Sequence, residues 1–211
     1  NLFGVINDIL DFSKIEAGKM SIEKAEFSLD NVLANISNLF AFQIEEKGLE
    51  LLFDVDMNVP MALKGDELRL NQVLTNLVSN AIKFTPAGQV TITSQLTHFD
   101  KSNRWQISVK DTGIGIDSTH IDDIFNPFFQ VDSSQTRQYE GSGVGLPVVK
   151  QMAQLMGATI EVDSTLGSGT QFMLTISMTN KQQSRQQHLL AGLTIIYYYY
   201  HEVGFLAKEL E

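Results

Sequence analysis

The chain has 211 residues, of which 43% are hydrophobic and 19% are charged, and its formal net charge is −10 at pH 7. That length holds one good-sized domain plus an appendage, and that composition is typical of a globular protein and unlike a disordered one. The negative charge argues against a broad surface for nucleic acid or anionic lipid, because phosphates would be repelled, and the absence of cysteine excludes disulfides and Cys-based metal sites.

The first 17 residues predict an amphipathic helix, because apolar side chains such as Ile6, Ile9 and Leu10 recur at helical spacing. Gly18 is a typical residue at which such a helix stops. The apolar pattern starts at residue 1 with no capping residue before it. We therefore expect this helix to be the end of a longer one.

Apolar periodicity and turn-forming residues predict the elements that follow. In chain order these are a strand at 22–27, a helix from a cap at Asp30 to Lys47, a strand at 49–55, a helix at 66–84, strands at 90–98 and 105–110, a helix at 144–156, and strands at 158–162 and 170–177. Together they predict one α+β domain.

Two segments fall outside this pattern. Residues 112–142 are rich in Gly, Asp, Ser, Gln and Asn, with one short apolar island at 121–129. A loop of that length inside a domain is usually functional, such as a lid over a ligand. Residues 181–188 are polar and predict a linker, and the apolar stretch 189–200 is too short to span a bilayer.

The long helix at 66–84 carries a polar stripe. Asn76, Asn80 and Lys83 follow one another at i, i+4 and i+7, beside apolar positions that border the buried face. A solvated helix face is the alternative, and it would suffice for any single asparagine. For the trio we favour a binding site, because a carboxamide oxygen is a hard ligand that suits Mg²⁺ and a lysine suits phosphate.

The motif D-T-G-I-G-I, residues 111–116, directly follows a predicted strand. Its glycines permit tight turns and close approach of a ligand to the backbone. Asp111 at the strand end can accept a hydrogen bond from an exocyclic amine, which would select adenine over guanine. A strand-ending turn is one alternative, and the Asp-Thr-Gly of aspartic proteases is another. The protease alternative needs an all-β fold and a second such motif, and the predicted helices argue against it.

Two further glycine runs follow the polar loop. G-S-G-V-G-L, residues 141–146, opens a predicted helix, where backbone N–H groups can bind phosphate. A Rossmann interpretation fails because Leu146 stands where the third glycine would be, and the chain has no P-loop motif. The last run, G-S-G-T at 167–170, opens a strand and by itself predicts a hairpin turn.

Together, in this order, the motifs resemble the catalytic and ATP-binding domain of sensor histidine kinases, whose superfamily also includes type II topoisomerases, Hsp90 and MutL. The resemblance rests on N-L-V-S-N-A-I-K-F-T at 76–85, D-T-G-I-G-I at 111–116, I-F-N-P-F-F-Q at 124–130, G-S-G-V-G-L at 141–146 and G-S-G-T at 167–170. Residues 6–20 are similar to the end of the second helix of the dimerisation bundle in hybrid kinases. The resemblance implies the two-layer, Bergerat-type α+β fold, in which a mixed β-sheet is covered by helices on one face.

The same resemblance implies a site for ATP and Mg²⁺. Its nucleotide-binding residues would be Asn76, Asn80, Lys83, Phe84, Asp111, Gly113, Gly115, Gly141, Gly143, Gly145, Leu146 and Thr170. Asn80 would coordinate Mg²⁺, and Asp111 would bind the adenine amine. The glycines from 141 onward would form the hinge of an ATP lid and contact the phosphates, while Phe125 and Phe128 would pack the lid. No residue of the domain is expected to act as a covalent catalyst.

The expected reaction is transfer of the γ-phosphate of ATP to a histidine that this sequence lacks. His98, His120 and His188 have no acidic neighbour, and His201 precedes Glu202 but lacks the proline of the family's acceptor motif. The resemblance implies three partners for the protein: the histidine of a dimerisation bundle in its own or a partner chain, a second copy in a homodimer, and a response regulator or receiver domain. It also implies a cytoplasmic domain of a protein anchored in the plasma membrane.

The expected domains are a helix remnant at 1–19, the ATP-binding domain at 20–180, and a linker with a further segment at 181–211. Residues 192–210 resemble the first strand and helix of a receiver domain, although tyrosines replace its acidic pair. A β-prone tail packed on the domain is the alternative, and the sequence does not decide between the two.

Two other functions compete with the kinase. A hydrolytic ATPase of the superfamily carries a glutamate four residues before the Mg²⁺-binding asparagine, and this chain has Asn76 there, which cannot take a proton from water. A non-enzymatic regulator would keep the fold and bind a partner kinase. The intact motifs argue against that alternative.

Overall fold

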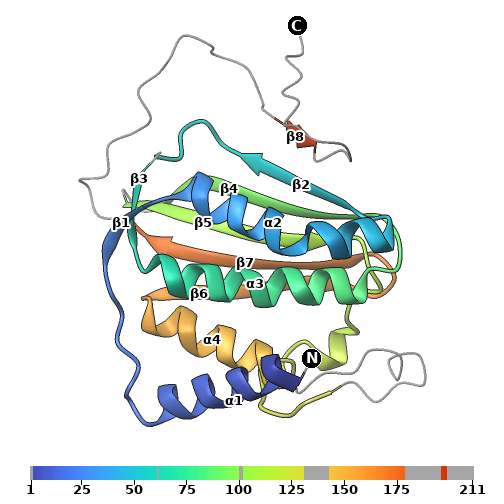
Figure 1. Cartoon of the computed structure of the whole chain (residues 1–211), viewed down its shortest axis with the longest axis horizontal. Coiled ribbons are helices and arrows are strands. Elements are labelled where there is room, and N and C mark those ends of the chain that lie inside the picture. The colour runs from blue at the N-terminus through green and yellow to red at the C-terminus, as the bar shows by residue number, and fades with distance from the viewer. Residues whose placement is uncertain (1, 61, 100–101, 131–142, 179–195, 199–211) are drawn as a thin grey trace, which may run out of the picture.

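The structure is a computed structural model that describes residues 2–60, 62–99, 102–130, 143–178 and 196–198 (Figure 1). Its elements are α1 (Leu2–Glu16), β1 (Ala25–Ser28), α2 (Leu29–Lys47), β2 (Glu50–Val55), β3 (Ala62–Gly65), α3 (Glu67–Phe84), β4 (Gln89–Phe99), β5 (Ser102–Asp111), the 3-10 helix η1 (Ser118–His120), α4 (Gly145–Leu155), β6 (Ala158–Thr165), β7 (Gly169–Ser177) and β8 (Ile196–Tyr198). The predicted α+β class is confirmed.

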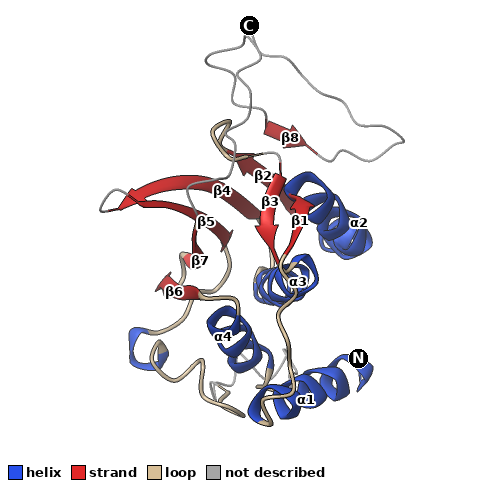
Figure 2. Cartoon of the chain, turned by 90° about the vertical axis from the view of Figure 1, so that its left-hand side faces the viewer, coloured by secondary structure: helices blue, strands red, loops and turns tan. Residues whose placement is uncertain are grey.

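The main sheet has the strand order β6-β7-β5-β4-β2-β8. Strands β2 and β4 are parallel, and the remaining pairs are antiparallel. Figure 2 shows α2, α3 and α4 on one face of this sheet. The prediction of a mixed sheet covered by helices on one face is therefore also confirmed.

Strand β5 shows how the sequence builds this layer. Trp105, Ile107 and Val109 are buried, because alternate side chains of a strand point to the same face and these face the helices. The same alternation brings Asp111 to the helix-covered side, at the end of the strand. The opposite face carries polar pairs, such as Gln95 with Gln106, whose side chains lie 2.7 Å apart.

Helix α3 packs its apolar face between the sheet and the neighbouring helices. Its buried residues recur at helical spacing and are Leu70, Val73, Leu74, Leu77, Val78, Ala81 and Ile82. At its start, Asp66 caps the helix by accepting a hydrogen bond from the backbone N–H of Arg69 at 3.0 Å. At its end, the Lys47 ammonium donates to the carbonyl oxygens of Ile82 and Lys83, at 2.7 and 3.2 Å.

The structure corrects three details of the sequence interpretation. Helix α2 begins after Ser28, so the expected cap at Asp30 is wrong, and Asp30 lies in the first helical turn. The first strand lies at 25–28 and not at 22–27. It pairs with β3, which the sequence did not predict, because β3 has only four residues and Leu63 is its one buried side chain.

Helix α1 packs on the domain through Phe12 and Ile15, and the Asp11 carboxylate accepts a hydrogen bond from the Gln72 side chain of α3. In the described part of the chain, no helix is both long and apolar enough to cross a membrane. In the tail, β8 pairs antiparallel with β2 at the sheet edge. That pairing accords with a tail strand packed on the domain, and the domain boundaries themselves stay a prediction.

Asp66 is expected to hold the start of α3 and the segment before β1 together. Its second oxygen accepts from the backbone N–H of Glu23 at 3.0 Å, so Asp66→Ala removes a helix cap and leaves a second N–H without its partner. We expect a loss of about 2 kcal/mol in the free energy of unfolding, measured by urea denaturation. Asp66→Asn keeps an oxygen acceptor for the cap and should lose less. Equal unfolding midpoints for Asp66→Ala and the unaltered chain would contradict this role.

Candidate functional site

Asp111 ends β5 as a buried carboxylate with 5% of its surface exposed. Its Oδ1 atom accepts hydrogen bonds from the backbone N–H groups of Gly113 at 2.8 Å and of Thr170 at 3.2 Å. These donors belong to the loop after β5 and to β7, so the carboxylate ties the two segments together. Among the described residues, both recorded donors bind Oδ1 and none binds Oδ2. Oδ2 can therefore accept from a ligand.

The glycines next to Asp111 are required by close backbone approach. A Cβ on Gly113 would lie 2.3 Å from the carbonyl oxygen of Phe84, and one on Gly169 would lie 2.0 Å from that of Asp111. Gly115 adopts a φ of +67° and approaches Thr165 in the same way. No side chain fits at these positions without moving backbone. The loop after β5, the end of α3 and the β6–β7 turn thus form one closely packed unit.

Ser164 on β6 completes this unit, and the sequence analysis missed it. Its hydroxyl accepts from the backbone N–H of Ile116 at 2.8 Å, lies 2.8 Å from the hydroxyl of Thr170 and reaches the carbonyl oxygen of Gly169 at 3.0 Å. Ser164 lies in an alternating strand with no motif around it, so no local signal could have identified it. Its role depends on the pairing of β6 with β7.

The polar stripe of α3 lies beside this unit. Asn76, Asn80 and Lys83 are each half-buried, as a stripe at the border of a packed face should be. The Lys83 ammonium lies 4.7 Å from the centre of the Phe84 ring, and burial lowers the pKa of Lys83. The backbone of Phe84 accepts from the N–H of Ile114 at 3.2 Å, which fixes the end of the stripe to the loop after Asp111.

The start of α4 lies on the same side of the domain. Met156, just after α4, lines the same cavity as Asp66 and Leu70 at the start of α3, so the two helices run antiparallel (Figure 1). The first turn of α4, with Gly145 and Leu146, therefore lies toward the end of α3.

Gly143, just before α4, adopts a φ of +67°, and its carbonyl oxygen accepts from the N–H of Phe128 at 3.0 Å. Gly141 is the one predicted site residue that lies outside the described residues. Residues 131–142 of the polar loop, which include it, also lie outside them.

The aromatic segment before the lid is only partly packed. Phe125 meets Phe172 edge to face at a centroid distance of 6.3 Å, and the Lys150 ammonium lies 5.2 Å from the centre of its ring. Phe128 is 69% exposed with a φ of +63°, a left-handed conformation that is costly for an aromatic residue. Packing of these rings against a lid stays a prediction.

The donor set suits a metal ion that is shared with a ligand. The described residues contain no group of three or more His, Cys, Asp or Glu side chains that could hold a metal ion by themselves. Mg²⁺ is usually held by few protein oxygens, completed by phosphates and water. A single carboxamide such as that of Asn80 fits that pattern if phosphate oxygens supply further ligands.

Comparison with known proteins gives one family. The sequence profile described as "Histidine kinase-, DNA gyrase B-, and HSP90-like ATPase" matches residues 65–180. The chain is 41% identical over 191 residues to "Autoinducer 2 sensor kinase/phosphatase LuxQ" of Vibrio vulnificus (strain YJ016), and the match covers 89% of this chain and 22% of that relative.

Two solved structures share the fold. Full-length ShkA in complex with AMPPNP superposes with a TM-score of 0.73 at 32% identity, over 84% of this chain and 36% of that one. The histidine kinase ThkA in complex with the response regulator protein TrrA superposes with a TM-score of 0.65 at 25% identity, over 86% of this chain and 48% of that one.

The buried carboxylate of Asp111 is expected to lower stability at neutral pH. Burial raises its pKa above the ordinary value of 3.8, and the hydrogen bonds from Gly113 and Thr170 offset this only in part. Because the folded pKa is raised, the contribution of this group is full below pH 3.8 and is lost as the pH rises through the folded pKa. Asp111→Asn keeps an oxygen acceptor without the charge. We expect the variant to be more stable than the unaltered chain at pH 7.

Urea denaturation at several pH values checks this expectation. The stability difference between Asp111→Asn and the unaltered chain should shrink toward zero as the pH falls below 3.8, where the carboxylate is protonated in both states. A variant that is less stable at pH 7 would show that the charge stabilises the fold. A difference that does not depend on pH would show that titration of Asp111 does not cause it.

Proposed function

This chain belongs to the family of histidine kinase-, DNA gyrase B- and HSP90-like ATPases, and from that premise we propose that it presents the γ-phosphate of a bound ATP to a histidine. The domain is the ATP-binding domain of a sensor histidine kinase. The match to this chain covers only 22% of the length of the LuxQ relative. The activity and partners of the whole protein are therefore part of the proposal.

The observation that carries the proposal is the buried carboxylate of Asp111. Gly113 and Thr170 hold its Oδ1, which orients Oδ2 toward an incoming base. An acceptor in that place suits the exocyclic amine of adenine and would repel the carbonyl oxygen of guanine. A ligand amine would replace water around a charge that is already buried, so the hydrogen bond would form in a region of low dielectric. ShkA, which shares this fold, was solved with AMPPNP, an analogue of ATP.

The phosphates are assigned to the side of the site between α3 and α4. Asn76, Asn80 and Lys83 follow one stripe of α3, and the first turn of α4 adds backbone N–H groups at Gly145 and Leu146. Gly143 is assigned to the phosphate loop on the same grounds, and Gly141 on its motif alone. Mg²⁺, held by Asn80 and the phosphates, would neutralise charge on the transferred group. Lys83 would gain an anionic partner, which opposes the lowering of its pKa by burial.

Transfer to an amino acid is favoured over hydrolysis of ATP. Asn76 lies one helical turn before Asn80, at the position from which a carboxylate would activate water. Its carboxamide cannot act as a base, so this position does not supply the group that activates water in the hydrolytic members of the superfamily. Positioning of ATP against an external nucleophile is then the main source of catalysis.

The nucleophile is assigned to a histidine of a dimerisation bundle, in this chain or in a partner of a homodimer. Residues 1–19, which contain helix α1, would be the end of that bundle. Residues 20–180 would be the ATP-binding domain, and residues 181–211 would be a linker with a further segment. A response regulator or receiver domain would take the phosphoryl group, as suggested by the ThkA structure, which contains a response regulator. We also propose that the domain is cytoplasmic and that the whole protein is anchored in the plasma membrane.

Asp111→Asn is expected to weaken binding of a fluorescent ATP analogue by about 5- to 150-fold, because a matched buried hydrogen bond worth about 1–3 kcal/mol is lost. Fluorescence titration with and without Mg²⁺ measures the affinity, and Asn80→Ala should remove the Mg²⁺-dependent part alone. Asp163→Asn, which changes an exposed carboxylate on β6, is the matched control. Unchanged affinity in a folded Asp111→Asn variant would remove Asp111 from the site.

The chain alone is expected to bind ATP without labelling itself. Incubation with γ-labelled ATP, followed by acid or base treatment, identifies phosphohistidine as acid-labile label. Addition of the histidine-bearing bundle of the same protein should restore the label, because alignment of the reactants can contribute roughly 7–11 kcal/mol. Acid-labile label on the chain alone would reveal an acceptor within it, with His201 the first candidate. Rapid phosphate release that Asn76→Ala abolishes would instead support hydrolysis.

A further inference from the structure

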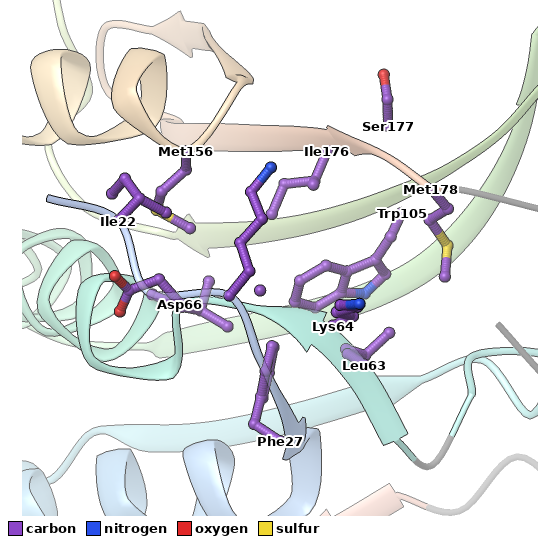
Figure 3. Close-up of a pocket in the computed structure, with 13 residues that line it drawn as sticks. Ile22, Phe27, Leu63, Lys64, Asp66, Trp105, Met156, Ile176, Ser177 and Met178 are labelled. Carbon is purple, nitrogen blue, oxygen red and sulfur yellow. The ribbon is translucent and has the colours of Figure 1, made fainter. Parts of the chain in front are cut away.

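A cavity lies at the opposite end of α3 from the proposed nucleotide-binding residues. It has a volume of about 280 Å³ and lies where the segment before β1, the two-stranded β1–β3 sheet, the start of α3, β5 and the ends of α4 and β7 meet (Figure 3). Its lining residues are Ile22, Lys24, Phe27, Leu63, Lys64, Gly65, Asp66, Leu70, Trp105, Met156, Ile176, Ser177 and Met178. None of them belongs to the nucleotide site.

The buried part of the lining is apolar and its polar groups already have partners. Phe27, Leu63, Leu70 and Trp105 are each less than 9% exposed. The Trp105 indole N–H donates to the Ser94 hydroxyl at 2.8 Å. Both carboxylate oxygens of Asp66, the one acidic side chain of the lining, accept backbone N–H groups. A ligand here would gain little from hydrogen bonds inside the cavity and would bind by burial of apolar surface.

The positively charged residues of the cavity lining are exposed to solvent. The lining includes the exposed lysines Lys24 and Lys64, one before β1 and one on β3. Glu26 of β1 lies opposite Lys64 of β3 in the strand register, and among the described residues neither lysine forms an ion pair. Two ammonium groups beside an apolar cavity favour a ligand with one apolar end and one anionic end.

We propose that this cavity binds a small apolar anion, such as a medium-chain alkyl carboxylate. The alkyl chain contacts Trp105 and its apolar neighbours, and the carboxylate meets Lys24 and Lys64. The volume lies just below the roughly 300–1,000 Å³ of typical ligand pockets, so the cavity suits a ligand smaller than a nucleotide. Ile22 and Lys24 belong to the segment between α1 and the domain, so a bound ligand would also fix that segment to the domain.

Trp105 makes the proposal directly testable, because it is the one tryptophan in the sequence. Titration with decanoate, below its micelle concentration, should change Trp105 emission in a saturable way, with calorimetry as an independent measure. Decanol should bind with a smaller affinity that does not depend on the lysines. Bound ATP should not compete with decanoate, because the two sites share no residue. An absence of decanoate binding would therefore not contradict the proposed nucleotide site, and an absence of ATP binding would not contradict the cavity proposal.

Matched variants separate the cavity from the surface. Lys24→Ala and Lys64→Ala should each weaken decanoate binding by about two- to fivefold, whereas Lys110→Ala, an exposed lysine on β5, should change nothing. Ile22→Phe adds volume at a half-buried wall and should weaken decanoate and decanol alike, with folding checked by circular dichroism. An absence of saturable binding, equal losses in Lys110→Ala and Lys64→Ala, or undiminished binding in a folded Ile22→Phe variant would overturn the proposal.

Discussion

The packing of α3 against the sheet is the constraint on which the other features depend. Its apolar face is buried along its whole length, so the rotation of the helix about its own axis is fixed by burial of apolar surface. Asn76, Asn80 and Lys83 can then lie only at the border of that face, and the end of the helix at Phe84 lies next to the loop after β5. Both helix ends are held by groups from outside the helix, Asp66 at the start and Lys47 at the end. A helix fixed in this way presents its polar stripe without rearrangement when a ligand arrives.

Asp111 illustrates what such a site costs the fold. A carboxylate at the end of a strand is normally solvated, whereas this one is buried and its pKa is raised. The backbone donors Gly113 and Thr170, with Ser164 behind them, hold the carboxylate in place and compensate part of the cost of its burial. The remaining cost is understandable if the second oxygen is kept for a base amine. Stability and recognition are therefore opposed at this residue.

The two ends of α3 lie in different surroundings. One end faces the loops after β5 and before α4, to which the proposed nucleotide site is assigned. The other end lies beside the segments before β1 and after β7. Ile22 and Met178 of these segments line the cavity there. An apolar cavity at that junction lies beside the connection to α1.

The sequence by itself determined the features that local chemistry encodes. Apolar periodicity located α3 and the strands β2, β4, β5, β6 and β7, and the spacing of Asn76, Asn80 and Lys83 placed them on one stripe. Glycine runs marked turns that only glycine can form, as at Gly169. Tertiary structure decided the rest, because it depends on which segments meet. The strand β3 exists only through its pairing with β1, Ser164 acts only because β6 lies beside β7, and the cavity around Trp105 is made by segments far apart in the chain.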